Sequence, residues 1–197
     1  MRQFVFACAV ALMAAPQAMA EVIPISAISA YFNGFTTGQA RFSQYNADGS
    51  VSNGTLSIHR PGRIRFEYDP PVSALVLAAG GRVAIFDDKS NVAPEQYPLR
   101  RTPLSIILDE NVDLSRARMV VSHTAQGALT SIVAQDPENP EIGSIRMIFT
   151  DNPITLRQWV VTDEAGTETR VVLENLQTGM RLRSAMFSIP IELERRQ

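Results

Sequence analysis

Residues 54–71, GTLSIHRPGRIRFEYDPP, carry an arginine where a strand pattern calls for an apolar side chain. Side chains alternate between the two faces of a strand, so Leu56, Ile58 and Arg60 share one face. A buried arginine is costly unless its charge is paired or hydrogen-bonded. The stretch therefore predicts a strand whose apolar face ends in a cation, just before Pro61, and it raises the question of a partner for that cation.

Further strands are predicted before and after this stretch. Short apolar runs alternate with polar residues, and turn sequences such as Asp163-Glu164-Ala165-Gly166 separate them. About eleven short strands joined by tight turns are typical of an antiparallel meander. The expected strands are 38–46, 51–60, 63–68, 73–79, 81–87, 117–123, 128–135, 143–150, 154–162 and 167–176, with a last one near 182–188.

The alternation also predicts which side chains face the core. In the strand 154–162, Leu156 and Val160 fall on one face and Trp159 on the other. Outer packing and contact with a partner are both open for Trp159, and packing is the preferred interpretation. In the strand 63–68, Arg63 and Arg65 are expected to face water.

Two segments break the β pattern and are predicted as short helices. In residues 23–33, apolar side chains recur at near-helical spacing between Pro24 and Gly34, which suit a helix start and a helix stop. In residues 102–109, a threonine and a proline precede apolar residues that share a helical face.

These helices are too small to fill a barrel built from the predicted strands. About ten strands at roughly 4.8 Å spacing make a surface about 50 Å wide, whereas each helix is about 15 Å long. Either the barrel narrows on itself or it keeps an apolar cavity, and a cavity predicts an apolar ligand.

Composition limits the classes of protein to consider. The chain has 197 residues, enough for one domain, and 45% of them are hydrophobic, so we expect a folded protein. Lys and Arg number 18 against 20 Asp and Glu, and the formal net charge is -2. Nucleic-acid binding usually requires a basic excess, so no nucleic-acid partner is expected.

Residues 1–20 read as a secretory signal peptide. Arg2 precedes the uncharged run Phe4–Ala15, and Ala18-Met19-Ala20 fits an A-x-A cleavage site. The run is shorter than the about 20 apolar residues that span a bilayer. We expect a soluble mature chain of residues 21–197, forming one domain without a cysteine, because Cys8 lies within the signal.

No set of residues for catalysis is visible in the sequence. The histidines, His59 and His123, have no cysteine or carboxylate at metal-ligand spacing, and no G-x-S-x-G motif or glycine-rich phosphate loop occurs. The acidic pair Asp87-Asp88 is better explained as a solvated turn than as a metal site. The sequence therefore predicts neither an enzyme nor a metal site nor a bound cofactor.

The stretch 54–71 resembles the signature of the LolA family of periplasmic outer-membrane lipoprotein carriers. Phe42 with Gln44, and Thr102 with the apolar residues after it, resemble other elements of the family, whereas Ser57 and Phe66 stand where the family often has tryptophan. The residues that match the signature are Gly54, Leu56, Ile58, Arg60, Pro61, Ile64, Arg65, Phe66, Tyr68 and Pro70.

The resemblance implies an incomplete antiparallel β-barrel with a helical lid over a hydrophobic cavity. Such carriers work in the periplasm, receive acylated lipoproteins from an inner-membrane ABC transporter, and pass them to an acceptor at the outer membrane without catalysing a reaction. A monomer is expected. The residues expected to line the cavity are Leu56, Ile58, Ile64, Phe66, Leu104, Ile107, Leu108, Phe42, Ile28 and Phe32.

Arg60 is then a candidate latch for the lid. Its guanidinium offers five donors, and carbonyls at helix ends carry partial negative charge. The alternative is an arginine that extends to water and packs on the turn Pro61-Gly62. Two other functions stay open at this point: a lipid-binding or envelope-sensing domain that acts through a protein partner, and, less well supported, an enzyme acting on lipid or peptidoglycan.

Overall fold

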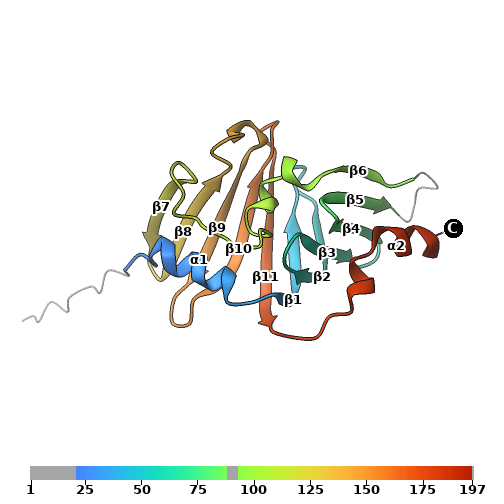
Figure 1. The fold of residues 1–197 in the computed structure, drawn as a ribbon, viewed down its shortest axis with the longest axis horizontal. Coiled ribbons are helices and arrows are strands. Elements are labelled where there is room, and N and C mark those ends of the chain that lie inside the picture. Colours follow the sequence, from blue (N-terminus) through green and yellow to red (C-terminus); the bar gives the residue numbers. More distant parts are fainter. Residues whose placement is uncertain (1–20, 88–92, 197) are drawn as a thin grey trace, which may run out of the picture.

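The computed structural model describes residues 21–87 and 93–196, and in these residues eleven strands form one antiparallel sheet (Figure 1). The predicted signal peptide 1–20, with Cys8, lies outside the described residues, as does Asp88. The strands are β1 (Thr37–Tyr45), β2 (Val51–His59), β3 (Arg63–Tyr68), β4 (Ala74–Ala79), β5 (Arg82–Asp87), β6 (Glu95–Pro98), β7 (Val120–Gln126), β8 (Leu129–Gln135), β9 (Ser144–Thr150), β10 (Thr155–Thr162) and β11 (Glu168–Thr178).

The sheet is open rather than closed. Its strand order is β6-β5-β4-β3-β2-β1-β11-β10-β9-β8-β7, so β6 and β7 are the two edges and the first strand pairs with the last. Figure 1 shows helix α1 (Ile25–Asn33) lying across one half of the sheet and helix α2 (Ile189–Arg195) beside the other half. The predicted incomplete antiparallel barrel of about eleven strands is confirmed.

Helix α1 begins and ends close to where the sequence predicts. Pro24 is the N-cap and Gly34 the C-cap, and the amide of Gly34 donates to the carbonyl of Ala30 at 2.8 Å. Ile28 and Phe32 point from this helix into the core, and both are almost completely buried. The apolar stripe of α1 therefore covers the concave face of the sheet.

The predicted helix 102–109 is wrong in type. The chain forms only a 3-10 turn there, η2 (Pro103–Ser105), followed by turns. The amide of Gly62 donates to the carbonyl of Leu108 at 2.8 Å, and the guanidinium of Arg60 donates to the carbonyl of Asp109 at 2.7 Å. Within the segment, the amides of Ser105 and Ile106 donate to carbonyls three residues back, and among these three amides only that of Leu108 donates four residues back, as in an α-helix. The pairing of the Leu108 and Asp109 carbonyls with the β2–β3 turn then ends the helical turns.

The predictions near the chain end also need correction. Residues 182–188 form no strand but a 3-10 turn, η4 (Ser184–Phe187), which leads into α2. Strand β6 was not predicted, because its sequence EQYP has no apolar alternation and ends in proline. Two further 3-10 turns, η1 (Leu99–Arg101) and η3 (Pro140–Ile142), lie in loops.

A bulge in β10 reverses the predicted position of Trp159. The register of β10 against β9 shifts between Leu156 and Gln158, which leaves Arg157 as an extra residue. Leu156 and Trp159 consequently both face the core, and each is only 1% exposed. The prediction that Trp159 lies on the outer face is wrong, because strict alternation does not hold across a bulge.

The outer face of the sheet has an apolar cluster of its own. Leu75, Leu77 and Phe86 from β4 and β5 pack there against Phe187 and Ile189 of the C-terminal segment. A sheet covered on both faces explains why β4 reads as an almost continuous apolar run. The short C-terminal segment therefore acts as a cover for this half of the sheet.

Arg65 does not face water as predicted, because the C-terminal segment covers it. Its guanidinium donates to Glu192 at 3.1 Å and to the carbonyl of Met186 at 3.2 Å, and the residue is 8% exposed. Glu192 also accepts from Arg196 at 2.9 Å. This buried, hydrogen-bonded ion pair ties α2 to β3.

The docking of α2 is expected to weaken in acid. Burial alone would raise the pKa of Glu192, but hydrogen bonds from Arg196 and Arg65 outweigh burial and hold that pKa below its usual 4.5. A group with a lowered folded pKa stabilises the fold above its unfolded pKa, and this contribution is lost as pH falls through the folded pKa. The protection factors of the α2 amides, which allow for the slower intrinsic exchange in acid, should therefore fall below about pH 4.5. Glu192→Gln should show the same loose α2 at every pH; an undiminished acid response in this variant would contradict the assignment.

Gly54, the first residue of the 54–71 stretch, is required by close packing. A Cβ at this position would lie 2.7 Å from the ring of Phe42 and closer still to the carbonyl oxygen of Glu67. Gly54→Ala should lower the free energy of unfolding by about 2–3 kcal/mol, measured by urea denaturation. Gly127→Ala is the control, because φ there is +57° but no atom lies within 4 Å. It should cost about 1 kcal/mol from backbone strain alone, and equal losses would contradict the packing argument.

Candidate functional site

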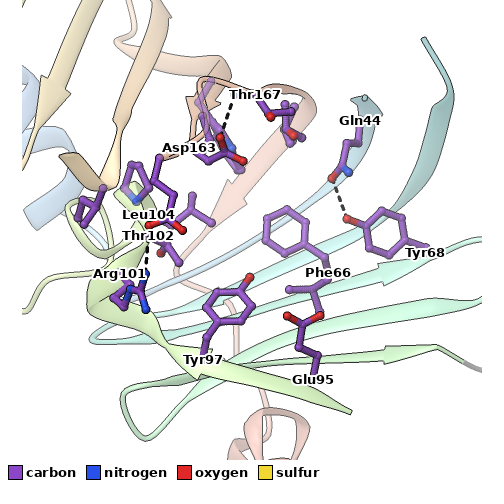
Figure 2. Close-up of a pocket in the computed structure, with 18 residues that line it drawn as sticks. Gln44, Phe66, Tyr68, Glu95, Tyr97, Arg101, Thr102, Leu104, Asp163 and Thr167 are labelled. Carbon is purple, nitrogen blue, oxygen red and sulfur yellow. Dashed lines mark hydrogen bonds and ion pairs between the residues drawn. The ribbon is translucent and has the colours of Figure 1, made fainter. Parts of the chain in front are cut away.

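A pocket of about 560 Å³ opens on the concave face between the β10–β11 hairpin and β6 (Figure 2). Phe66, Leu104 and Trp159 contribute apolar walls, and Tyr68 and Tyr97 lie across from the hairpin. A volume of this size lies within the range of small-molecule sites, roughly 300–1,000 Å³. The remaining lining residues are Gln44, Val76, Glu95, Arg101, Thr102, Pro103, Ile142, Val161, Asp163, Glu164, Thr167, Thr169 and Val171.

The mouth of the pocket is polar, although its walls are apolar. Arg101 donates to Glu164 at 3.1 Å, and both side chains are exposed. Tyr68 donates to the side-chain oxygen of Gln44 at 2.7 Å, and burial raises the pKa of Tyr68 to about 12 despite this bond. The Tyr68 hydroxyl is therefore neutral at ordinary pH. The arrangement suits a ligand with a long apolar part and a polar end.

Arg60 lies at the opposite end of β2 from this mouth. Tyr68 pairs with Gly54 near the start of β2, and Arg60 follows the end of that strand. Arg60 is 4% exposed, so the alternative of an arginine extended to water does not hold. Its own amide donates to the carbonyl of Thr36 at 2.7 Å, which fixes the backbone beside the chain that leaves α1.

The guanidinium of Arg60 joins two segments that cover the concave face. Nη1 donates to the carbonyl of Phe32 and, at 3.2 Å, to that of Phe35, so it holds the end of α1. Nη2 and Nε donate to the carbonyl of Asp109 at 2.7 and 3.2 Å. Nη2 also lies 3.5 Å from the carbonyl of Glu110. One side chain thus contacts both segments at once.

The charge of Arg60 is kept despite its burial. Burial lowers the pKa of the guanidinium, and the nearby Asp109 carboxylate partly offsets this effect. Arginine is effectively always protonated in proteins, so these contacts are charge-assisted hydrogen bonds. Such bonds are stronger than neutral ones, but each breaks when its segment moves away.

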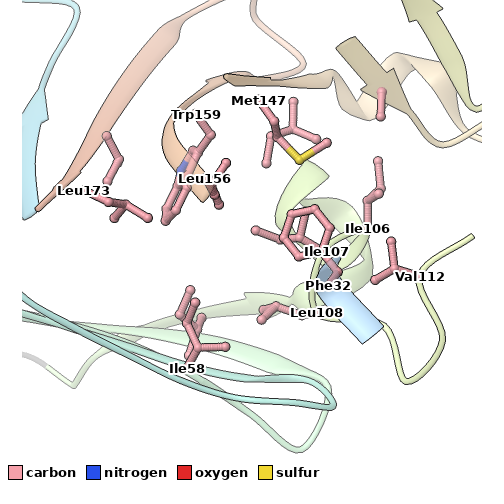
Figure 3. Close-up of a cluster of buried hydrophobic side chains, with 14 of the residues drawn as sticks. Phe32, Ile58, Ile106, Ile107, Leu108, Val112, Met147, Leu156, Trp159 and Leu173 are labelled. Carbon is pink, nitrogen blue, oxygen red and sulfur yellow. The ribbon is translucent and has the colours of Figure 1, made fainter. Parts of the chain in front are cut away.

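The residues predicted to line the cavity are brought together, but most of them are packed. Phe66 and Leu104 border the pocket, whereas the others lie in the concave core. Figure 3 shows Phe32, Ile107 and Leu108 between the walls of the sheet, with Ile58 on one side and Met147 on the other. Their role in binding a ligand stays a prediction. The packed residues are Ile28, Phe32, Phe42, Leu56, Ile58, Ile64, Ile107 and Leu108.

Several site residues could not be found from the sequence. The alternation predicted the wrong face for Trp159, because it did not account for the bulge in β10. Tyr97 lies on strand β6, which was not predicted. Gly62 was assigned only to a turn, although its amide holds the carbonyl of Leu108. Gln44 and Tyr68 were noted in the sequence, but their contact depends on the pairing of β1 with β2 and of β2 with β3.

Across residues 21–87 and 93–196, no group of three or more His, Cys, Asp or Glu side chains is arranged to hold a metal ion. None of the helices in this described part of the chain is long and apolar enough to cross a membrane.

Comparisons with known proteins agree with this geometry. The chain matches the family model "Outer membrane lipoprotein carrier protein LolA" over residues 33–190. It is 27% identical to an outer-membrane lipoprotein carrier protein of Chromobacterium violaceum, over 91% of this chain and 89% of that protein. It is 26% identical to one of Methylococcus capsulatus, over 85% and 84%. A lipoprotein-sorting protein domain of Vibrio parahaemolyticus shares the fold, with a TM-score of 0.50 and 9% identity over 85% of this chain and 96% of that one.

Proposed function

Because this chain belongs to the LolA family of outer membrane lipoprotein carrier proteins, we propose that it shuttles lipoproteins with their acyl chains held on its concave face. The observation that carries the proposal is the pair of segments that Arg60 holds over that face. Beneath them lie apolar side chains that an acyl chain could contact, and a pocket is already open at the far end.

The energetics explain why a carrier is needed. Each buried methylene contributes about 0.8 kcal/mol, so exposing a chain of roughly fifteen methylenes to water costs on the order of 12 kcal/mol. A lipoprotein with several chains cannot cross an aqueous space unaided. A carrier must shield the chains, yet it must also let them go.

The lid formed by α1 and residues 106–114 provides a way to weaken net binding. Cargo reaches the deep part of the concave face only when Phe32, Ile107 and Leu108 move out. The free energy of the Arg60 contacts is therefore subtracted from the free energy of cargo binding, and the apparent affinity falls with the population of the open form. Re-forming these contacts helps to expel the cargo at the acceptor.

The proposal includes a location and partners. Cleavage after Ala20 would release residues 21–197 into the periplasm as one soluble domain, expected as a monomer. Lipoproteins would arrive from an inner-membrane ABC transporter and leave to the outer membrane, where present through a dedicated acceptor. The protein would perform no catalysis and need no cofactor.

Mass spectrometry of material that co-purifies with the protein from the periplasm tests this function. Acylated lipoproteins bound in a defined ratio are the expected result. Phospholipid alone would favour a lipid-binding or envelope-sensing domain that acts through a protein partner. Turnover of an acyl ester by the pure protein would contradict the non-catalytic assignment.

A further inference from the structure

The two lid segments meet at Asn33, the last residue of α1. We infer that Asn33 couples α1 to residues 106–114, so that the two segments open as one unit. The inference rests on the proposed function, because only a carrier needs both segments to leave the concave face together. It concerns a positioning residue rather than one that touches cargo.

The side chain of Asn33 pairs with both backbone groups of one residue in the other segment. Its Nδ2 donates to the carbonyl of Val112 at 2.9 Å, and its Oδ1 accepts from the amide of Val112, also at 2.9 Å. The same Nδ2 lies 3.2 Å from Oδ1 of Asn111. A primary amide that uses its donor and its acceptor on one residue fixes both distance and orientation.

The contact continues one turn earlier on the same helix face. Ser29 lies four residues before Asn33, and its hydroxyl accepts from the amide of Leu114 at 3.1 Å. The side chains of Val112 and Leu114 are buried in the concave core, 2% and 1% exposed. The backbone of this segment therefore faces α1 while its apolar side chains point into the core.

Asn33 also shares the Arg60 latch. Nη2 of Arg60 donates to Oδ1 of Asn33 at 3.2 Å and to the carbonyl of Asp109 at 2.7 Å. Oδ1 of Asn33 thus accepts from both Arg60 and the amide of Val112, and movement of Arg60 disturbs the bond between α1 and residues 106–114. Without Asn33, α1 and residues 106–114 would each keep contacts to the sheet but lose their contact with each other at this point.

A substitution that weakens only α1 tests whether the two segments open together. If they are coupled, the second segment should respond to it as well. Tyr31 in α1 accepts from the amide of Leu156 on β10 at 3.3 Å, a bond that involves no residue of the segment 106–114. Tyr31→Phe removes this bond and should accelerate exchange of the helix amides about fivefold. With Asn33 present, the amide of Gly62, which donates to the carbonyl of Leu108 and so reports docking of the second segment, should accelerate by the same factor.

The experiment is residue-resolved hydrogen exchange by NMR on residues 21–197, without lipoprotein. In Asn33→Leu, the Tyr31→Phe effect should remain about fivefold in α1 but fall to about twofold or less at Gly62, because only the Arg60 contacts and the Ser29–Leu114 bond then link the two segments. The matched control is Asn139→Leu, because Asn139 is exposed and its side chain donates only to Asp136 among the contacts of the described chain. That variant should transmit the full effect.

Equal transmission with and without Asn33 would overturn the inference, as would no transmission in the natural chain. Asn33→Asp provides a second check, since it keeps the acceptor for Val112 and loses the donor, and it should transmit only partly. Because no lipoprotein is present, a failure of cargo binding in the co-purification experiment is seen separately from a failure of coupling.

Discussion

Arg60→Leu is expected to keep the fold but to trap cargo. The change removes the charge-assisted bonds to the carbonyls of Phe32 and Asp109 and leaves those carbonyls unpaired in the closed form. Hydrogen bonds to charged groups contribute about 1.5–3 kcal/mol each. Losing two of them should change the equilibrium constant between closed and open lid by on the order of 10³-fold in favour of the open form. A triacylated lipopeptide should bind correspondingly more tightly, and its transfer to acceptor vesicles should slow by a similar factor.

Two variants make the Arg60 result interpretable. Arg60→Lys keeps the charge but not the planar fork, so its release should be intermediate. Arg63→Leu removes a nearby arginine whose only hydrogen bond, within the described chain, is to the carbonyl of His59, and it should release cargo normally. Normal release of the lipopeptide by a folded Arg60→Leu variant would contradict the proposal that Arg60 holds the lid closed.

Val161→Trp is expected to abolish most cargo binding by filling the pocket. Val161 is partly buried, lies on β10 and borders the pocket beside Trp159. If the added ring excludes about five methylenes of an acyl chain, the loss is about 4 kcal/mol, or on the order of 10³-fold in affinity. Titration with a fluorescent triacylated lipopeptide measures the loss.

The matched control for the pocket is Val121→Trp. Val121 lies on the edge strand β7, and half of its surface is exposed, 52%. It is not among the residues that border the pocket. This variant should bind like the natural chain. Equal binding by Val161→Trp and Val121→Trp would show that the acyl chains lie elsewhere.

The sheet could be predicted from the sequence because strand signals are local. Alternation and turn residues placed ten of the strands within a few residues of their ends, and the β9 residues Ile145, Met147 and Phe149 all face the core as their spacing indicates. The inward direction of Arg60 followed from the same alternation. Its partners did not, because they are backbone carbonyls far away in the chain.

The errors arose where long-range contacts override local pattern. Arg157 adds a residue to β10, which no alternation predicts, and this turned Trp159 inward. Arg65 was expected to face water because nothing in the sequence shows that α2 returns to cover β3. Residues 103–109 have helical spacing, but the carbonyls of Leu108 and Asp109 pair with Gly62 and Arg60 of the β2–β3 turn, and the helix does not continue.

The candidate site was only partly predictable for the same reason. The apolar residues of the concave face could be named from their strands, but the structure shows that side chains of α1 and of residues 106–114 pack among them. Only Phe66 and Leu104 of the predicted lining border open space among the described residues. Whether a face is packed or open depends on how segments distant in sequence meet, and local spacing does not record this.

Photo-cross-linking most directly tests the claim that acyl chains enter beneath the lid. A triacylated lipopeptide with a photoreactive group at the end of one acyl chain is bound to the natural protein, irradiated, and mapped by mass spectrometry. The account predicts adducts on the concave face, at Phe66, Leu104 and Trp159, and deeper, near Ile58, in the open form that Arg60→Leu favours. Adducts confined to the outer face of β4 and β5, or to exposed β7, would contradict it.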